Sequence, residues 1–257
     1  MNYKMILQYE GTRFDGWQKQ KNTERTVQGK LEQVLSRLAG QEVEDQGAGR
    51  TDAGVHALGQ TASFRLDTEL KDGELKEYLN RYLPENIAVL ELEQAPPRFH
   101  ARLNACWKVY RYHLAYGEQK PVFDRRLVYR LEQEPDFAAM KKAARFLVGT
   151  HDFRAFCANK HMKKSTVRTV YDIRIEEGEE PGRASIRFYG DGFLYHMVRI
   201  LTGTLLEVGY GKRRAEDMGK ILESRDRAMS GFTAPPEGLF LEKVSYDKWE
   251  RTNDTTI

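Results

Sequence analysis

The sequence predicts an α+β fold in two halves, and three observations lead to this prediction. Segments in which hydrophobic and polar residues alternate predict strands, and segments with hydrophobic residues three and four positions apart predict helices. Both halves show the same order, strand-helix-strand-strand-helix-strand, and the segment Ala95–Asn104 separates them. This order is typical of the ferredoxin-like fold. We therefore expect two such halves, residues 1–103 and 104–257, with mainly antiparallel sheets and helices on one face, leaving the other face to line a cleft.

In the first half, the clearest element is a helix that begins after Thr26 and ends at Gly40. Thr26 is a typical N-cap residue and Gly40 a typical residue after a helix, and the hydrophobic residues between them fall at helical spacing. A second helix, with Leu75 and Leu79 on its hydrophobic face, ends before Pro84. The expected strands are Lys4–Tyr9, Glu42–Gln46, Gln60–Leu66 and Ile87–Leu92.

The second half repeats the order of elements without repeating the sequence. Its expected strands are Ala105–Ala115, Val167–Ile175, Ala184–Tyr189 and Leu239–Tyr246. Its expected helices are Asp136–Val148, Leu194–Val208 and a short one at Ala215–Ser224.

The composition is that of an ordinary globular protein. Of the 257 residues, 40% are hydrophobic and 31% are charged, and no hydrophobic run reaches the length of a membrane span. The N-terminus lacks the hydrophobic region of a signal peptide, so we expect a cytoplasmic protein without a membrane partner. Cys106 and Cys157 lack the spacing of metal ligands, so we expect reduced thiols and no metal.

Positive charge is concentrated in the second half of the chain. The formal net charge is +3 overall, −2 for residues 1–103 and +5 for residues 104–257. Gathered lysines and arginines suit a phosphate backbone, so the pattern favours a polyanionic partner over solvated loops. The three basic clusters are Lys160–Arg168, Lys212–Arg214, and Arg125 with Arg126 and Arg130.

The segment Gly47–Gln60, GAGRTDAGVHALGQ, is the strongest candidate for a functional site. It carries one carboxylate, Asp52, and one guanidinium, Arg50, among four glycines. Glycines let the backbone bend sharply and let a ligand approach it closely, and loops commonly present catalytic groups. The alternative is a tight turn in which Arg50 and Asp52 pair with each other at the surface.

Seven segments together resemble the tRNA pseudouridine synthase A family. They occur in the family's order and cover nearly the whole chain. Two departures, Glu10 where Asp is usual and Phe232 where a smaller residue is common, lie away from the expected chemistry. The segments are YEGTRFDGWQKQ (Tyr9–Gln20), TVQ (Thr26–Gln28), GRTDAGVHA, FHAR (Phe99–Arg102), WKVYRYHL (Trp107–Leu114), DGFLYHMVR (Asp191–Arg199) and TAPPEGLFL (Thr233–Leu241).

This resemblance implies an isomerase, an intramolecular transferase, that acts on tRNA. It implies conversion of uridines 38, 39 and 40, in the anticodon stem-loop, to pseudouridine. It further implies a homodimer whose open sheet faces form a continuous RNA-binding cleft. The reaction breaks an N-glycosidic bond, rotates the uracil and rejoins it through carbon. Nothing is oxidised and no group comes from outside, so we expect no cofactor.

The reaction requires a carboxylate, and the resemblance assigns that role to Asp52. Asp52 either attacks as a nucleophile or removes a sugar proton as a base, and both roles stay open. Either role needs the ionised form, which a nearby guanidinium stabilises. The family supplies this guanidinium at Arg199. On pattern alone, a surface arginine beside the hydrophobic face of its helix is the preferred interpretation of Arg199, and the resemblance reverses that preference.

The resemblance also assigns substrate contacts to Tyr110 and Arg50. Tyr110 is expected to stack on the target base and to relay the C5 proton, although an aromatic residue on a strand more often belongs to a core. Arg50 is expected to enter the RNA helix in place of the flipped uridine. We further expect Arg102, Lys163, Lys164 and Arg168 to contact RNA.

Several neighbouring residues are expected to support the site. Phe14, Asp15, Trp17 and Gln18 are expected to brace the first strand and the loop that carries Asp52. His56 follows Asp52 by four positions and resembles a general base, but a structural hydrogen bond to the loop backbone is the preferred interpretation.

Two other functions fit the sequence less well. A glycoside hydrolase usually needs two carboxylates at the bond, and this loop offers one. A non-catalytic RNA-binding module of the same fold would show aromatic signatures on its central strands, and none is clear.

Overall fold

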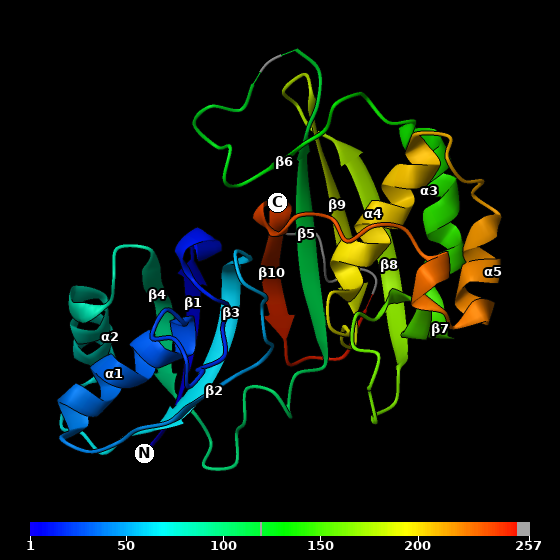
Figure 1. The fold of residues 1–257 in the computed structure, drawn as a ribbon. Coiled ribbons are helices and arrows are strands. Elements are labelled where there is room, and N and C mark those ends of the chain that lie inside the picture. The colour runs from blue at the N-terminus through cyan, green and yellow to red at the C-terminus, as the bar shows by residue number, and fades with distance from the viewer. Residues whose placement is uncertain (119, 251–257) are drawn as a thin grey trace. The chain divides into compact units, whose positions relative to one another are not determined.

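The computed structural model describes residues 1–118 and 120–250 (Figure 1). Its internal contacts divide the chain into two compact units. Unit 1 comprises Met1–Trp107 and the segment that begins at Phe240, and unit 2 comprises Lys108–Leu239. The sequence-based boundary at 103/104 lies close to the first change of unit. However, the segment from Phe240 onwards belongs with unit 1 because its strand pairs within that sheet.

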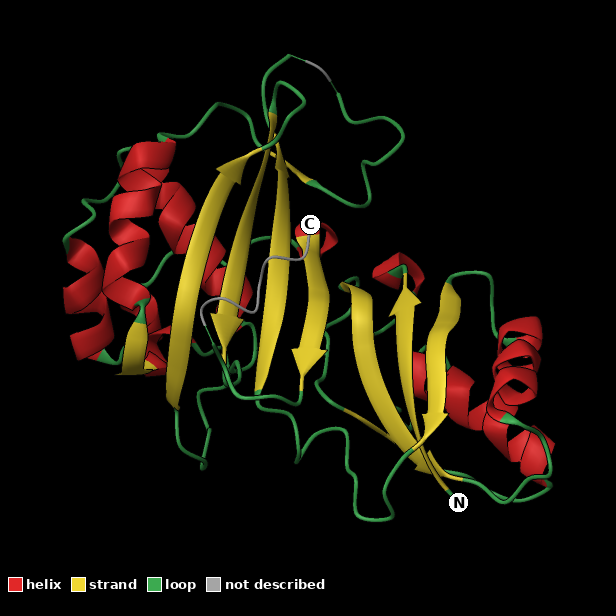
Figure 2. Cartoon of the chain, turned by 180° about the vertical axis from the view of Figure 1, so that it is seen from behind, coloured by secondary structure: helices red, strands yellow, loops and turns green. Residues whose placement is uncertain are grey.

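Unit 1 has the predicted order of elements. β1 lies between β4 and β3 with antiparallel pairing, β2 pairs antiparallel with β3, and β10 pairs parallel with β3. Helices α1 and α2 lie on one face of this sheet (Figure 2). The elements are β1 (Asn2–Tyr9), η1 (Gly11–Arg13), α1 (Val27–Ala39), β2 (Asp45–Gly47), β3 (His56–Arg65), α2 (Asp72–Tyr82), β4 (Ile87–Gln94) and β10 (Leu239–Ser245).

Helix α1 shows how the sequence sets an element's ends. The Thr26 side chain accepts a hydrogen bond from the Gly29 N–H at 3.2 Å, as an N-cap does. At the other end, Gly40 has a φ of 66°, in the left-handed region that glycine adopts without strain. Leu31 and Leu35 of the predicted hydrophobic face are fully buried. Both predicted ends are confirmed.

Unit 2 is built on the strand order β5-β9-β8-β7, all antiparallel, and β6 pairs parallel with β5. Helices α3, α4 and α5 lie on one face of this sheet (Figure 2). The elements are β5 (Trp107–Ala115), β6 (Tyr129–Arg130), α3 (Phe137–Ala144), η2 (Arg145–Leu147), β7 (Gly149–Asp152), η3 (Phe153–Phe156), β8 (Val167–Glu177), β9 (Arg183–Gly190), α4 (Met197–Gly209), α5 (Asp217–Ser224), η4 (Arg227–Met229) and η5 (Pro236–Gly238).

The two faces of the β5–β9 pair differ in character. On one face Tyr110 lies opposite Phe188 and Tyr112 opposite Ile186, and all four are buried. On the other face, Arg111 lies opposite Arg187. This second face also carries ion pairs, from Arg187 to Glu176 at 2.7 Å and from Arg174 to Asp172 at 3.0 Å. The Tyr110 side of this strand pair is therefore buried, and the other side carries charged residues beside the buried Val109 and Tyr189.

The structure corrects several details of the prediction. The sheets are mixed rather than mainly antiparallel, because β10 and β6 join by parallel pairing. The helix expected at Asp136–Val148 ends at Ala144 and continues as the 3-10 turn η2. Helix α4 begins at Met197 rather than Leu194, because His196 before it has a left-handed φ of 60°. Strands β6 and β7 were not predicted, since both are too short to show alternation.

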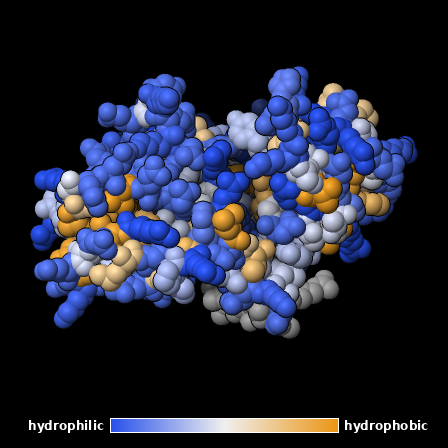
Figure 3. Space-filling model, turned by 90° about the horizontal axis from the view of Figure 1, so that it is seen from below, coloured by the Kyte–Doolittle hydropathy of each residue, from blue (hydrophilic) through white to orange (hydrophobic). Residues whose placement is uncertain are grey.

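Hydrophilic residues cover most of the face shown in Figure 3, and hydrophobic ones gather in small groups. Among the helices of the described residues, none is long and apolar enough to cross a membrane.

Candidate active site

The loop at residues 48–55 joins β2 to β3 and carries the candidate catalytic carboxylate. At its start, the Ala48 N–H donates to the Thr61 carbonyl oxygen at 2.7 Å. At its end, the Val55 N–H donates to the Asp52 carbonyl oxygen at 3.2 Å, and Gly54 between them has a φ of 77°. This φ suits glycine, so the turn after Asp52 depends on it. Asp52 is half-buried and keeps an exposed side.

The segment Tyr9–Gln20 holds this loop in place through backbone hydrogen bonds. The Gly54 N–H donates to the Phe14 carbonyl oxygen at 3.2 Å, and the Trp17 N–H donates to the Thr51 carbonyl oxygen at 3.1 Å. Trp17 is itself buried. The loop is thus bonded to this segment on both sides of Asp52, which limits how far its carboxylate can move.

The side chains of Asp15 and Gln18 form hydrogen bonds with residues outside the loop. Asp15 accepts hydrogen bonds from Thr23 at 2.6 Å and from Arg25 at 3.2 Å, which lowers the pKa of its carboxyl group. The Gln18 amide donates to the buried Gln28 at 2.6 Å. Both residues therefore fix the shape of the bracing segment rather than the loop itself.

His56 has a structural environment. It is fully buried, its Nδ1 accepts a hydrogen bond from the Gly11 N–H at 2.9 Å, and its ring stacks on Phe240 at a centroid distance of 4.6 Å. A histidine whose Nδ1 accepts in this way carries its proton on Nε2 when neutral. The structural hydrogen bond therefore joins His56 to the backbone of Gly11 in η1, whereas the sequence predicted a bond to the backbone of the loop that carries Asp52.

We expect Gly11→Ala to destabilise the protein, because an added Cβ would overlap the carbonyl oxygen of Val55 at the end of the loop. Overpacking of this kind costs about 1–3 kcal/mol. The control is Gly73→Ala in α2, where a Cβ meets nothing within 4 Å. That change should leave the free energy of unfolding unchanged or raise it by up to about 1 kcal/mol. Urea unfolding measures both, and equal stabilities would contradict the close approach of Gly11 to Val55.

Arg50 is exposed, two residues before Asp52. Within residues 1–118 and 120–250, no ion pair joins its guanidinium to the Asp52 carboxylate. The alternative of a simple Arg50–Asp52 surface pair is therefore not what the loop forms, and the guanidinium of Arg50 is accessible.

Tyr110 lies on β5 with only 8% of its surface exposed, and its ring packs edge-on against Phe193 at a centroid distance of 5.2 Å and an interplanar angle of 81°. Edge-to-face packing holds an aromatic ring in one orientation. Phe193 belongs to the segment DGFLYHMVR, for which sequence reasoning assigned a role only to Arg199. The position of Phe193 in this segment was the one feature of the sequence that could have indicated its contact with Tyr110.

Arg199 lies in the first turn of α4 and is tied to the segment that follows η4. Its Nε donates to the Ala234 carbonyl oxygen at 2.7 Å, and the Ala234 N–H donates back to the Arg199 carbonyl oxygen at 3.1 Å. The next residue, Pro235, accepts a hydrogen bond from the Tyr112 hydroxyl at 2.6 Å. Within unit 2, these bonds connect α4 with the strand that carries Tyr110. Burial, more than any charge, raises the pKa of Tyr112 well above its usual value, while the Arg199 charge lowers it.

The residues expected to contact RNA differ in how exposed they are and in whether hydrogen bonds hold their side chains. Lys163 and Lys164 are exposed in the segment between η3 and β8, and Arg102 is exposed after β4. Arg168 is half-buried, and its guanidinium donates to the carbonyl oxygens of Ser165 and Val167 at 3.0 and 2.6 Å.

Comparison with known proteins decides the family. The family model described as tRNA pseudouridine synthase matches residues 5–104 and 143–247. The chain belongs to this family. The enzyme is 46% identical over 245 residues to "tRNA pseudouridine synthase A" of Bacillus sp. (strain KSM-64), covering 95% of this chain and 99% of that protein. It is 45% identical over 246 residues to the protein of the same name from Acetivibrio thermocellus, with the same coverage of both chains.

Among solved structures, a chain of a Cbf5–Nop10–Gar1 complex aligns at a TM-score of 0.36 and 14% identity, covering 77% of this chain and 46% of that chain. This likeness is too low to bear on the fold. The family and the two relatives establish that the enzyme is an isomerase that forms pseudouridine in tRNA.

Proposed function

We propose that this enzyme isomerises uridines 38, 39 and 40, on the 3′ side of the anticodon stem-loop, without a cofactor. The observation that supports this best is the braced loop of unit 1, which presents the half-buried Asp52 and the exposed Arg50 two residues apart. A fixed carboxylate suits attack at one sugar, and an exposed guanidinium suits entry into a helix from which a base has been flipped.

In the proposed reaction, the bond between C1′ and N1 breaks and a bond between C1′ and C5 forms. C5 loses a proton and N1 gains one, so no oxidant, reductant or transferred group is needed. Asp52 starts the reaction either as a nucleophile or as a base at the sugar. Tyr110 stacks on the detached uracil and relays the C5 proton, and Arg199 supplies a guanidinium as partner for the catalytic carboxylate.

Positional mapping of the product tests this proposal. The purified enzyme is incubated with an unmodified tRNA transcript that carries uridine at positions 38, 39 and 40 and elsewhere, with chelator and without added cofactor. We expect pseudouridine at those three positions alone. Modification at other positions would overturn the assignment of the stem-loop, and activity that depends on an additive would overturn the cofactor-free mechanism.

We expect Lys163→Gln combined with Lys164→Gln to weaken tRNA binding and to reduce its dependence on salt. If both exposed ammonium groups contact phosphates, the slope of log K against log salt should fall by up to about two units. Binding titrations at several salt concentrations measure this slope. Lys141→Gln on α3, also exposed, serves as the control. An unchanged slope in the double variant would place the RNA elsewhere.

We also propose, from the order of elements, that both halves are ferredoxin-like, and, from the lack of a signal peptide, that the enzyme is cytoplasmic. From the family resemblance we propose that the open sheet faces bind the RNA and that the enzyme is a homodimer. The order β1-α1-β2-β3-α2-β4 supports the fold type for the first half. Sedimentation equilibrium tests the dimer, and a monomer at micromolar concentration would contradict it.

A further inference from the structure

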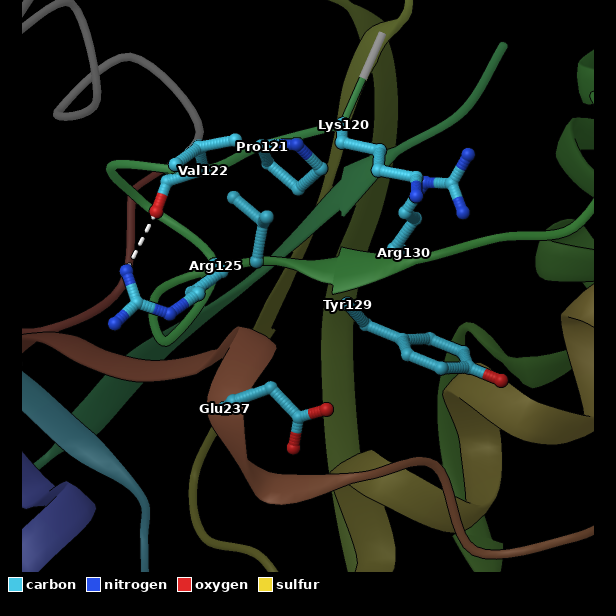
Figure 4. Close-up of a pocket in the computed structure, with 8 residues that line it drawn as sticks. Lys120, Pro121, Val122, Arg125, Tyr129, Arg130 and Glu237 are labelled. Carbon is cyan, nitrogen blue, oxygen red and sulfur yellow. Dashed lines mark hydrogen bonds between the residues drawn. The ribbon is translucent and has the colours of Figure 1, made fainter. Parts of the chain in front are cut away.

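A pocket in unit 2, outside the residues assigned to chemistry, combines positive charge with an aromatic ring and one carboxylate. It has a volume of about 410 Å³ and lies between the segment 120–130 and η5 (Figure 4). Figure 4 shows Glu237 on the opposite side of the pocket from Lys120, Pro121 and Val122. Its lining residues are Lys120, Pro121, Val122, Arg125, Val128, Tyr129, Arg130 and Glu237.

The pocket wall is held in place by the fold. Asp124, within the wall segment, forms an ion pair with Arg183 at the start of β9 at 2.9 Å. The Arg125 guanidinium donates to the Val122 carbonyl oxygen at 2.6 Å, which fixes one cation beside the pocket. At the end of the segment, Tyr129 pairs with β5 opposite Leu114. A ligand therefore meets a largely formed site and need not order a loose loop.

The pocket lies on the same side of β5 as Tyr110. Tyr110, Tyr112 and Leu114 alternate along one face of β5, and the Tyr112 ring packs edge-on against Tyr129 at a centroid distance of 6.4 Å. Tyr129 lies opposite Leu114, so the pocket begins about 13 Å along the strand from Tyr110 at ~3.3 Å per residue. That separation is too large for one base to occupy both places, but suits two nucleotides of one RNA segment.

We propose that this pocket binds an unpaired nucleotide of the tRNA other than the target uridine, with its phosphate on Arg125, Lys120 or Arg130 and its base between Tyr129 and Glu237. Cations beside an aromatic ring are the usual combination for single-stranded RNA. Phe123, which follows the lining residue Val122 in the chain, is fully exposed and offers a second ring for stacking. The inference rests on the enzyme's action on tRNA and not on which uridine is modified.

The carboxylate of Glu237 gives the pocket a preference among bases. A carboxylate only accepts hydrogen bonds, and guanine offers two adjacent N–H donors, at N1 and N2, on its Watson–Crick edge. Adenine presents an acceptor, N1, beside its amino group and fits a carboxylate poorly. The pocket therefore selects guanine.

The first test measures tRNA binding. We expect Arg125→Gln to weaken binding several-fold and to lower the salt slope by about one unit. The matched control, Arg145→Gln, removes the same charge from an exposed site in η2 of the same unit and should change neither quantity. An inactive wild type would contradict the proposed function, whereas an active wild type with unchanged binding in Arg125→Gln would overturn the pocket.

The second test uses GMP and AMP as probes, titrated into the full-length enzyme and followed by NMR. We expect the wild type to bind GMP more tightly than AMP by several-fold and Glu237→Gln to bind the two alike, while Arg125→Gln weakens both equally. Equal binding of GMP and AMP by the wild type, or a GMP preference that survives in Glu237→Gln, would overturn the base contact.

Discussion

Replacement of Asp52 by alanine is expected to abolish pseudouridine formation while leaving the affinity for tRNA within a few-fold of wild type. Loss of a general base costs about 10²–10⁴ in rate, and loss of a nucleophile removes the reaction path itself. Binding depends mainly on basic residues elsewhere, because phosphate contacts supply most of the affinity for RNA. The main chain of the loop should be retained, since Thr51, Asp52 and Gly54 hold it through hydrogen bonds of their backbone groups.

Single-turnover assays with labelled tRNA, together with equilibrium binding, separate these two effects. Glu44→Ala, an exposed carboxylate just before β2, is the control and should behave as wild type. Asp52→Asn also distinguishes the functions weighed from the sequence: only a synthase loses uridine isomerisation while it keeps RNA binding. Isomerisation near the wild-type rate in a verified Asp52→Ala protein would remove Asp52 from the mechanism.

Substitutions of Tyr110 are expected to separate stacking from proton transfer. Phenylalanine keeps the ring and leucine does not, while both lack the phenol oxygen. If that oxygen relays the C5 proton, both variants should lose about 10²–10⁴ in single-turnover rate. Only Tyr110→Leu should also lose the stacking contribution, about 1–3 kcal/mol in holding the base. The edge-on contact with Phe193 should keep the ring of Tyr110→Phe in its place.

The control for Tyr110→Phe is Tyr78→Phe on α2, which removes a phenol oxygen far along the chain from the catalytic segments. Thermal unfolding of the Leu variant shows whether the loss of a largely buried ring disturbs the fold. A Tyr110→Phe protein as fast as wild type would leave Tyr110 as a stacking platform. The proton would then move through water or Asp52.

The elements that could be predicted from the sequence are those whose ends carry local signals. Thr26 caps α1 through its side chain and Gly40 ends it through a left-handed φ, and the strand predicted at Ala105–Ala115 matches β5 within two residues. Strand β7 has four residues and β6 has two, too few to show a period. The parallel pairing of β10 with β3 joins residues from opposite ends of the chain, and no local pattern reports such a pairing.

In the candidate site, too, local patterns in the sequence predicted some residues, whereas contacts between distant residues could not be predicted. Asp52 and Arg50 were recognisable because a glycine-rich loop between strands is a local pattern, and the roles of Tyr110 and Arg199 came from the resemblance. The contacts that hold Tyr110 and Arg199, from Phe193 and Ala234, join residues distant in the sequence. The pocket beside Glu237 could not be predicted either, because η5 and the segment 120–130 meet only in the folded chain.

The pairing of β10 with β3 has a consequence for synthesis of the enzyme on the ribosome. Unit 1 begins at the N-terminus, but its sheet is completed only when Phe240 and Leu241 emerge and pair with His56 and Ala57. Every residue of unit 2 is translated before that moment. Until then the start of β3, at His56 and Ala57, lacks its partner on that edge, whereas β2 already pairs with Ala62–Phe64, and an unpaired stretch invites pairing with other chains. A chain that stops before Phe240 keeps Asp52 and its loop but leaves that edge open, so premature termination yields an aggregation-prone fragment rather than a shorter enzyme.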